Sequence, residues 1–166
     1  MINYDNYINE GYFRQNLYHF TTLYPLKKIF EEDKLDLGYY DNPVNGENKR
    51  TLSLTRNKNF KLERYSTLIL EFDGDLLYQD YKIIPYDYYM QSGKETKTKS
   101  DPNRKHIVQS EEIILKPLYD VHKYLVSVEF YDYNDIYKET LLIEKLLELN
   151  SEIKFKYKNK VINYGF

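Results

Sequence analysis

Three short groups of polar residues in this 166-residue chain could bind or polarise a ligand. In the first group, His19 and Thr21 lie two residues apart in a strand-like run. An imidazole and a hydroxyl would therefore project from the same side of a pleated chain and could hold the polar edge of a ligand. The alternative is a buried histidine satisfied by the backbone, followed by a threonine that only caps the next helix.

The second group lies at the end of a predicted strand. Ser53 and Thr55 alternate onto one face, and Arg56 follows them. A guanidinium at the end of a strand can pair bidentately with phosphate oxygens, a task for which arginine suits better than lysine. In the alternative interpretation, the strand is an edge strand with two exposed hydroxyls and a surface arginine.

The third group begins a later strand. Gln109 and Glu111 would share a face, while Glu112 would point the other way. A single carboxylate of this kind can hydrogen-bond a sugar hydroxyl and stabilise the positive charge of a developing oxocarbenium ion. The two adjacent glutamates leave the register open, and we prefer Glu111 because it shares a face with Gln109. Alternatively, both are solvated charges at the start of the strand.

Composition excludes other kinds of chemistry. The chain has no cysteine, which rules out disulfides, thiolate nucleophiles and thiolate metal sites. The three histidines, His19, His106 and His122, are too widely spaced for a helical metal site, and we predict no metal. With 24 basic and 26 acidic residues the net charge is −2, unlike a dedicated nucleic-acid binder. No signal peptide or apolar span is found, which predicts a soluble, cytoplasmic protein without membrane contact.

The elements that must position these residues fit one domain spanning residues 1–166. Connections between most strands are too short for a crossover helix, which predicts an α+β domain with two small, mostly antiparallel sheets and flanking helices. Strands are predicted over residues 17–20, 51–55, 66–72, 81–85, 106–115, 124–131 and 153–157, and helices over residues 23–32 and 135–149.

The segments between these elements also carry predictions. Residues 1–15 form an N-terminal extension, residues 38–49 a polar loop, and Asp73, Gly74 and Asp75 a hairpin turn. Residues 91–105 contain almost nothing apolar and are predicted to be a mobile basic loop. The strand over residues 153–157 is predicted to be a terminal edge strand guarded by lysines.

Taken in order, the three polar groups resemble the three motifs of the ADP-ribosyltransferase superfamily. The relevant runs are LYHFT at residues 17–21, LSLTR at residues 52–56 and QSE at residues 109–111. The closest resemblance is to the DarT-type DNA-thymidine ADP-ribosyltransferase toxins. The four-arginine-and-histidine pattern of the related RNA 2′-phosphotransferases is not found.

The resemblance implies a cleft between two sheets that holds NAD as a substrate. It also implies that Glu111 is catalytic and assists the departure of nicotinamide. The remaining residues of the three motifs would contact NAD, with Arg56 at its diphosphate: His19, Phe20, Thr21, Ser53, Thr55, Arg56 and Gln109.

By the same resemblance, the acceptor is a macromolecule, either nucleic acid or protein, and the loop over residues 91–105 meets it. A toxin or a phage effector in conflict with a host would be the natural setting. Two alternatives stay open. The chain could be a non-catalytic module that binds nucleic acid or protein through its 20 tyrosines, or an NAD glycohydrolase that passes the ribosyl group to water.

Overall fold

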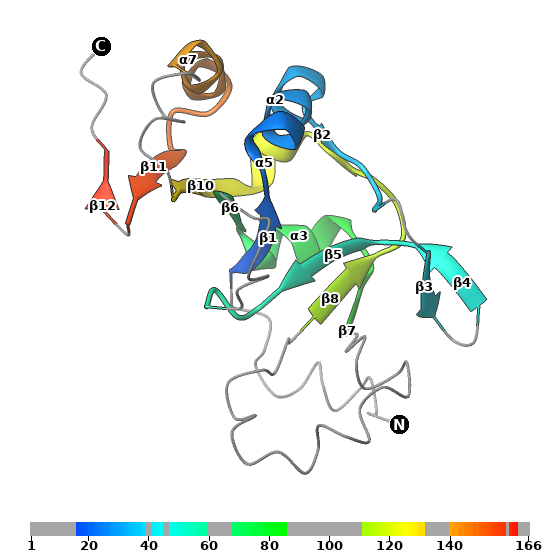
Figure 1. The fold of residues 1–166 in the computed structure, drawn as a ribbon. Helices are drawn as coiled ribbons and strands as arrows, with labels where there is room; N and C mark the ends of the chain where they lie inside the picture. The colour runs from blue at the N-terminus through cyan, green and yellow to red at the C-terminus, as the bar shows by residue number, and fades with distance from the viewer. Residues whose placement is uncertain are drawn as a thin grey trace.

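An eight-stranded sheet forms the centre of the computed structural model, which describes residues 16–38, 41–44, 47–59, 68–85, 111–131, 140–158 and 160–162 (Figure 1). From edge to edge, its strands are β12 (Lys160–Val161), β11 (Lys154–Tyr157), β10 (Leu125–Phe130), β6 (Leu68–Phe72), β1 (Leu17–Thr21), β5 (Leu52–Thr55), β8 (Glu111–Ile114) and β7 (Ile83–Pro85). Two small sheets accompany it: β2 (Lys34–Leu35) pairs with β9 (Leu118–Tyr119), and β3 (Asp41–Val44) with β4 (Glu47–Arg50).

The strands were predicted to be divided between two small sheets. This prediction is wrong, because β1 has a partner strand on each side and most strands join in one sheet. It pairs with β6 along its whole length and with β5 at Tyr18↔Thr55. That pair joins β5, β8 and β7 to the other five strands. Described neighbours are antiparallel except β10 and β11, which are parallel and have helix α7 (Thr140–Leu149) between them in the chain.

Two further predictions about strands need correction. The strand predicted over residues 153–157 exists as β11, but it is not the sheet edge, since β12 pairs with its outer side at Lys156↔Val161. The segment predicted as a polar loop over residues 38–49 contains the antiparallel pair β3 and β4. The backbone N–H of Gly38 donates to the carbonyl of Thr51 at 2.8 Å, which brings the two ends of this excursion together.

The predicted hairpin turn at Asp73 is instead the start of helix α3 (Gly74–Asp80). The side chain of Asp73 accepts a hydrogen bond from the backbone N–H of Leu76 at 3.0 Å. An aspartate satisfies one of the free N–H groups at a helix start in this way, so Asp73 caps a helix where the sequence suggested a reversal.

We expect Asp73→Ala to lower the free energy of unfolding by about 1 kcal/mol, because it leaves the Leu76 N–H without its side-chain acceptor. Urea denaturation measures the difference. The matched control is Asp73→Asn, which keeps an acceptor oxygen. Its free energy of unfolding should fall by no more than about 0.3 kcal/mol. Equal losses for the two variants would contradict the capping role.

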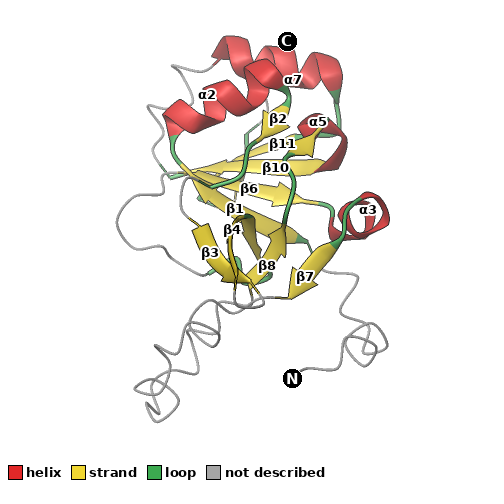
Figure 2. Ribbon diagram, turned by 90° about the vertical axis from the view of Figure 1, so that its right-hand side faces the viewer, coloured by secondary structure: helices red, strands yellow, loops and turns green. Residues whose placement is uncertain are grey.

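Helices cover one face of the large sheet, and we call this side the core face. Helix α2 (Leu23–Glu32) has the predicted bounds and buries Leu26, Ile29 and Phe30. Figure 2 shows α2 and α7 side by side over the sheet. By register and burial, the strand residues of the core face include Leu17, Leu52, Leu54, Leu68, Leu70, Phe72, Ile83, Ile114, Val128, Phe130 and Phe155.

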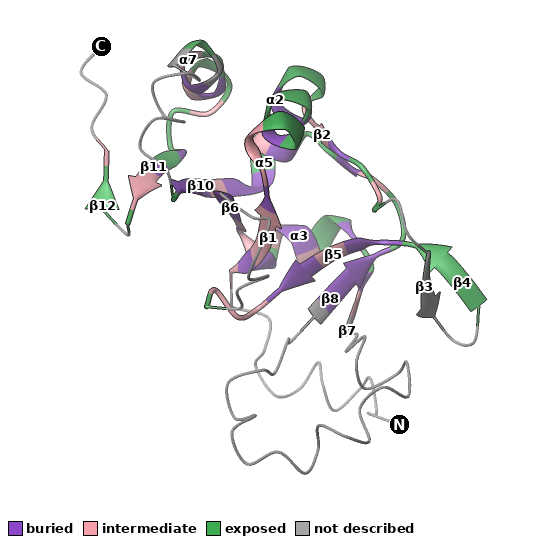
Figure 3. Ribbon diagram, viewed as in Figure 1, coloured by how far each residue is buried: buried purple, intermediate pink, exposed green. Residues whose placement is uncertain are grey.

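Burial follows this layering. Figure 3 colours most of β5, β6 and β8 as buried and the outer side of α2 as exposed. Within the described ranges, no helix combines the length and apolar composition needed to cross a lipid bilayer.

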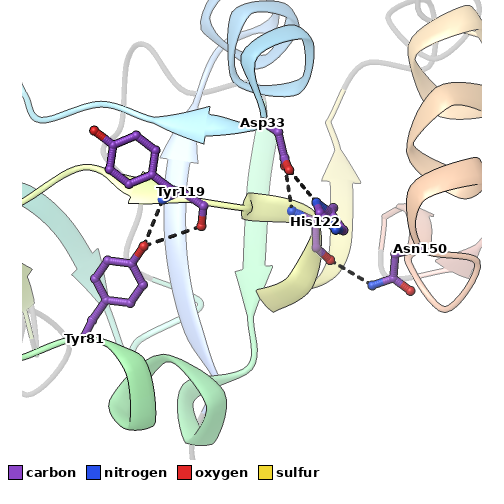
Figure 4. A network of polar contacts seen from close by, with 5 residues as sticks. All are labelled: Asp33, Tyr81, Tyr119, His122 and Asn150. Atoms are coloured by element: carbon purple, nitrogen blue, oxygen red, sulfur yellow. Dashed lines mark hydrogen bonds and ion pairs between the residues drawn. The ribbon is translucent and has the colours of Figure 1, made fainter.

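A polar network fixes the helices to one another (Figure 4). Asp33 ends α2 in a left-handed conformation, and its carboxylate accepts from the backbone N–H of His122 at 3.0 Å and contacts His122 Nδ1 at 2.5 Å. His122 belongs to helix α5 (Val121–Tyr124), and its carbonyl accepts from Asn150, which follows α7. The hydroxyl of Tyr81 accepts from the backbone N–H of Tyr119 at 2.9 Å. These contacts hold α2, α5 and the end of α7 together beside the core face.

Candidate active site

The register shows which candidate residues share a face of the sheet. Residues directly opposite each other on neighbouring strands project from the same face, and consecutive residues of one strand project from opposite faces. Tyr18 lies opposite Thr55, so His19 and Leu54 both project from the other face. Leu54 in turn lies opposite Glu112 on β8. His19 and Glu112 therefore lie on one face, and it is the core face.

His19, Thr21 and Glu112 interrupt an otherwise apolar surface. Thr21 follows His19 by two residues on β1 and shares its face, as the spacing predicted. Thr21 and Glu112 are buried, and His19 is half-buried. Polar groups among apolar neighbours cost free energy unless they are hydrogen-bonded or paired. The candidate active site consists of these three side chains, on β1 and β8, with β5 lying between the two strands.

Glu112 is held by an ion pair with Arg56. The Nε of Arg56 lies 3.0 Å from Oε1 of Glu112, whose side chain has 0% exposed surface, against 18% for Arg56. Sequence reasoning assigned Arg56 to a ligand phosphate and placed Glu112 away from the site. The structure instead brings these two side chains together, beside the strand that carries His19.

His19 is held in a defined protonation state. Its Nδ1 lies 3.0 Å from the backbone carbonyl of Ser53, which can only accept, so Nδ1 carries the hydrogen. Burial lowers the pKa of His19 by more than the hydrogen bond to Ser53 raises it, and the ring is therefore neutral near pH 7. A neutral ring protonated at Nδ1 presents Nε2 as an acceptor, which suits a hydroxyl group of a ligand.

Other predicted site residues lie elsewhere. Phe20, Ser53 and Thr55 alternate with the core-face residues of their strands and belong to the opposite face. The hydroxyl of Thr55 accepts from the backbone N–H of Asn57 at 3.0 Å and so supports a local turn. Ser53 contributes through its carbonyl, which accepts from His19.

Glu111 occupies the register position opposite Thr55, and only its backbone is among the described parts of the chain. Gln109 and the loop over residues 91–105 lie outside the described residues. Among the residues that are described, no group of three or more His, Asp or Glu side chains is arranged to hold a metal ion.

The face opposite the core face carries a polar network that sequence reasoning missed. Glu71 receives hydrogen bonds from Asn16 Nδ2 and Lys156 Nζ, each at 2.7 Å, and from the hydroxyl of Ser127. Burial alone would raise the pKa of Glu71, but these hydrogen bonds outweigh it and lower the pKa to about 2. The glutamate inside the apolar run LILEF was the available signal.

This network predicts a loss of stability in acid. Because folding lowers the pKa of Glu71 from 4.5 to about 2, its contribution is present above pH 4.5 and is lost as the pH falls toward 2. The shift corresponds to about 3 kcal/mol at neutral pH. Urea denaturation at pH 7 and pH 3 should show a smaller pH-dependent loss for Glu71→Gln than for the wild type. The same loss in both proteins would contradict this assignment.

Comparisons with known proteins bear on the fold. Neither a scan against protein-family models nor a search of curated proteins finds a match. Among solved structures, the chain is similar to DarT of Thermus sp. 2.9 in complex with carba-NAD+, with a TM-score of 0.57 and 9% sequence identity. The alignment covers 87% of this chain and 96% of that chain. At this identity the likeness is one of fold, and it confirms that this chain has a DarT-like fold.

Proposed function

We propose that this protein is an NAD-dependent ADP-ribosyltransferase that modifies a macromolecular acceptor. The observation that carries the proposal is the ion pair between the buried Glu112 on β8 and Arg56 at the end of β5, the strand that lies between β8 and the β1 strand of His19 and Thr21. It occurs in a fold similar to that of a DarT protein solved with an NAD analogue. A carboxylate can stabilise positive charge on a ribosyl unit, and an acceptor nitrogen and a hydroxyl can hold its hydroxyl groups.

In the proposed reaction, the bond between ribose C1′ and the nicotinamide nitrogen breaks, and its electron pair leaves with nicotinamide. Glu112 stabilises the positive charge that develops on the ribose. An acceptor nucleophile then forms a bond to C1′ and loses its proton to water. His19 would accept a hydrogen bond from a ribose hydroxyl through Nε2, and Thr21 would contact NAD beside it. Binding of NAD must uncover Glu112, because the carboxylate has no exposed surface.

Glu112 replaces Glu111 as our preferred catalytic residue. Glu112 lies on the face of His19, and its side chain is oriented by Arg56. An adjacent cation keeps a buried carboxylate ionised, which is the form that can stabilise a positive ribose. Glu111 is retained as the alternative and is tested beside Glu112.

The acceptor and the biological setting belong to the same proposal. We place the acceptor against the loop over residues 91–105, and a toxin or phage effector would be the setting. The basic side chains of this loop suit a nucleic acid, although a protein acceptor fits the net charge of −2: Lys94, Lys97, Lys99, Arg104 and Lys105.

The test uses the purified full chain with NAD labelled in its adenylate half. Nicotinamide release and label transfer are followed with single-stranded DNA, with RNA and with cell lysate. Label on a macromolecule would support the proposal and identify the acceptor. Nicotinamide release without labelling would favour a glycohydrolase over a transferase. If neither occurs and NAD does not raise the melting temperature, the proposal fails and a binding module becomes the better interpretation.

We expect His19→Asn to raise the KM for NAD roughly ten-fold with a smaller change in kcat. Asparagine can still donate to the Ser53 carbonyl, so the contact between β1 and β5 is kept while the Nε2 acceptor is lost. Steady-state nicotinamide release at varied NAD measures both constants. His122→Asn, which alters the histidine of the helix network, is the matched control and should leave KM unchanged. An unchanged KM in His19→Asn would exclude His19 from the NAD site.

A further inference from the structure

Arg56 lies in the turn that follows β5. Local hydrogen bonds on either side of Arg56 in the sequence stabilise the backbone of this turn. Before Arg56, the hydroxyl of Thr55 accepts from the backbone N–H of Asn57 at 3.0 Å. After it, the side chain of Asn57 accepts from the backbone N–H of Asn59 at 3.0 Å. Local side-chain contacts of this kind fix the backbone of a turn. They orient the turn internally, but they do not attach it to the rest of the sheet.

Lys58 attaches the turn to a distant strand. Its Nζ lies 2.9 Å from Oε2 of Glu129, whose side chain is only 4% exposed. Glu129 is on β10, and β6 and β1 lie between β10 and β5 in the sheet. In the register Glu129 lies opposite Ile69, so it belongs to the face opposite the core face. Lys58 therefore fastens the turn on one side of the sheet, while Arg56 pairs with Glu112 on the other.

The contacts of the turn on both faces of the sheet determine where Arg56 lies relative to Glu112. A buried carboxylate is tolerated only beside a well-placed cation, so the contact between Glu129 and Lys58 restricts where the turn can lie. The 3.0 Å contact between Arg56 and Glu112 depends on that placement, because a small displacement of the turn would separate them. We propose, on the basis of the function proposed above, that Lys58 and Glu129 form a positioning pair that holds Arg56 against Glu112.

The test replaces both partners together, because Lys58→Met alone would remove the cation 2.9 Å from the buried Glu129 carboxylate and keep the carboxylate charge. The variant is Lys58→Met/Glu129→Gln. Its matched control is Glu71→Gln/Lys156→Met, which removes the ion pair between β6 and β11 on the same face, with Nζ and Oε2 at 2.7 Å. Two measurements are made on the full chain. One is hydrogen exchange of the Arg56 Nε–H by NMR, which needs no catalysis, and the other is kcat and KM for nicotinamide release.

We expect exchange of the Arg56 Nε–H to be about ten-fold faster in Lys58→Met/Glu129→Gln, and kcat to fall about ten-fold to a hundred-fold with KM little changed. Glu71→Gln/Lys156→Met should be destabilised but unchanged in both measurements. Lys58→Arg keeps a cation beside Glu129 and should restore wild-type values of both.

The possible results separate the two proposals. Unchanged exchange at Arg56, or equal changes in both double variants, would overturn the positioning pair. Faster exchange at Arg56 in a protein whose wild type releases no nicotinamide would support the pair and overturn the proposed enzyme activity. Faster exchange with kcat unchanged in an active protein would overturn the role of the pair in catalysis.

Discussion

Glu112→Gln is expected to lower the rate of nicotinamide release from NAD by about a hundred-fold to a thousand-fold. Glutamine has nearly the same shape as glutamate but carries no charge, so it cannot stabilise a positive ribose electrostatically. Glu111→Gln should stay within about three-fold of the wild type, since only Glu112 lies on the face of His19 and contacts Arg56. Release of labelled nicotinamide under single-turnover conditions gives both rates.

A folding control must accompany this comparison. Glu112→Gln leaves the charge of Arg56 without the carboxylate 3.0 Å away, which costs stability as well as activity. The rates are therefore compared well below the melting temperature of each variant, with circular dichroism to confirm that each is folded. Loss of activity in Glu111→Gln and normal activity in Glu112→Gln would reverse the assignment and return the catalytic role to Glu111.

Arg56→Met is expected to lower the free energy of unfolding by about 3–5 kcal/mol at neutral pH. Methionine preserves most of the aliphatic length of arginine but leaves Glu112, with 0% exposure, beside no guanidinium. A buried carboxylate in this position must keep an unfavourable charge or take up a proton. Urea denaturation at pH 7 measures the loss.

A double variant separates the charge from the packing. Arg56→Met/Glu112→Gln removes both charges, so it should be more stable than Arg56→Met alone. Activity should be absent from the double variant. A cost below about 1 kcal/mol for Arg56→Met would mean that the pair behaves like an exposed salt bridge and does not hold the carboxylate in place.

Sequence patterns alone determined the elements whose signals are local. Helix α2 was predicted with its observed bounds because apolar residues recur at helical spacing, and Leu26, Ile29 and Phe30 are the residues that it buries. Strand β6 was predicted as part of the apolar run over residues 66–72, and it lies between β10 and β1. The shared face of His19 and Thr21 likewise follows from the pleat of one strand, which needs no knowledge of its neighbours.

A local signal can also support two structures. Asp73, Gly74 and Asp75 are typical turn residues, yet aspartate is equally suited to cap a helix. The apolar residues that follow settle the matter by packing, since Leu77 is fully buried in the core. The turn prediction failed because it weighed three residues without the burial of the next helical turn.

Only the tertiary structure decided how the strands combine and which residues meet. The strands form one large sheet because Tyr18 on β1 pairs with Thr55 on β5. Our preference for Glu112 over Glu111 depends on the pairing of Leu54 with Glu112. A shift of one residue in either register would send Glu112 to the opposite face. Such pairings join residues far apart in the chain, and the packing of the whole sheet selects among them. No short stretch of sequence contains that information, so the site emerged only when β1, β5 and β8 came together.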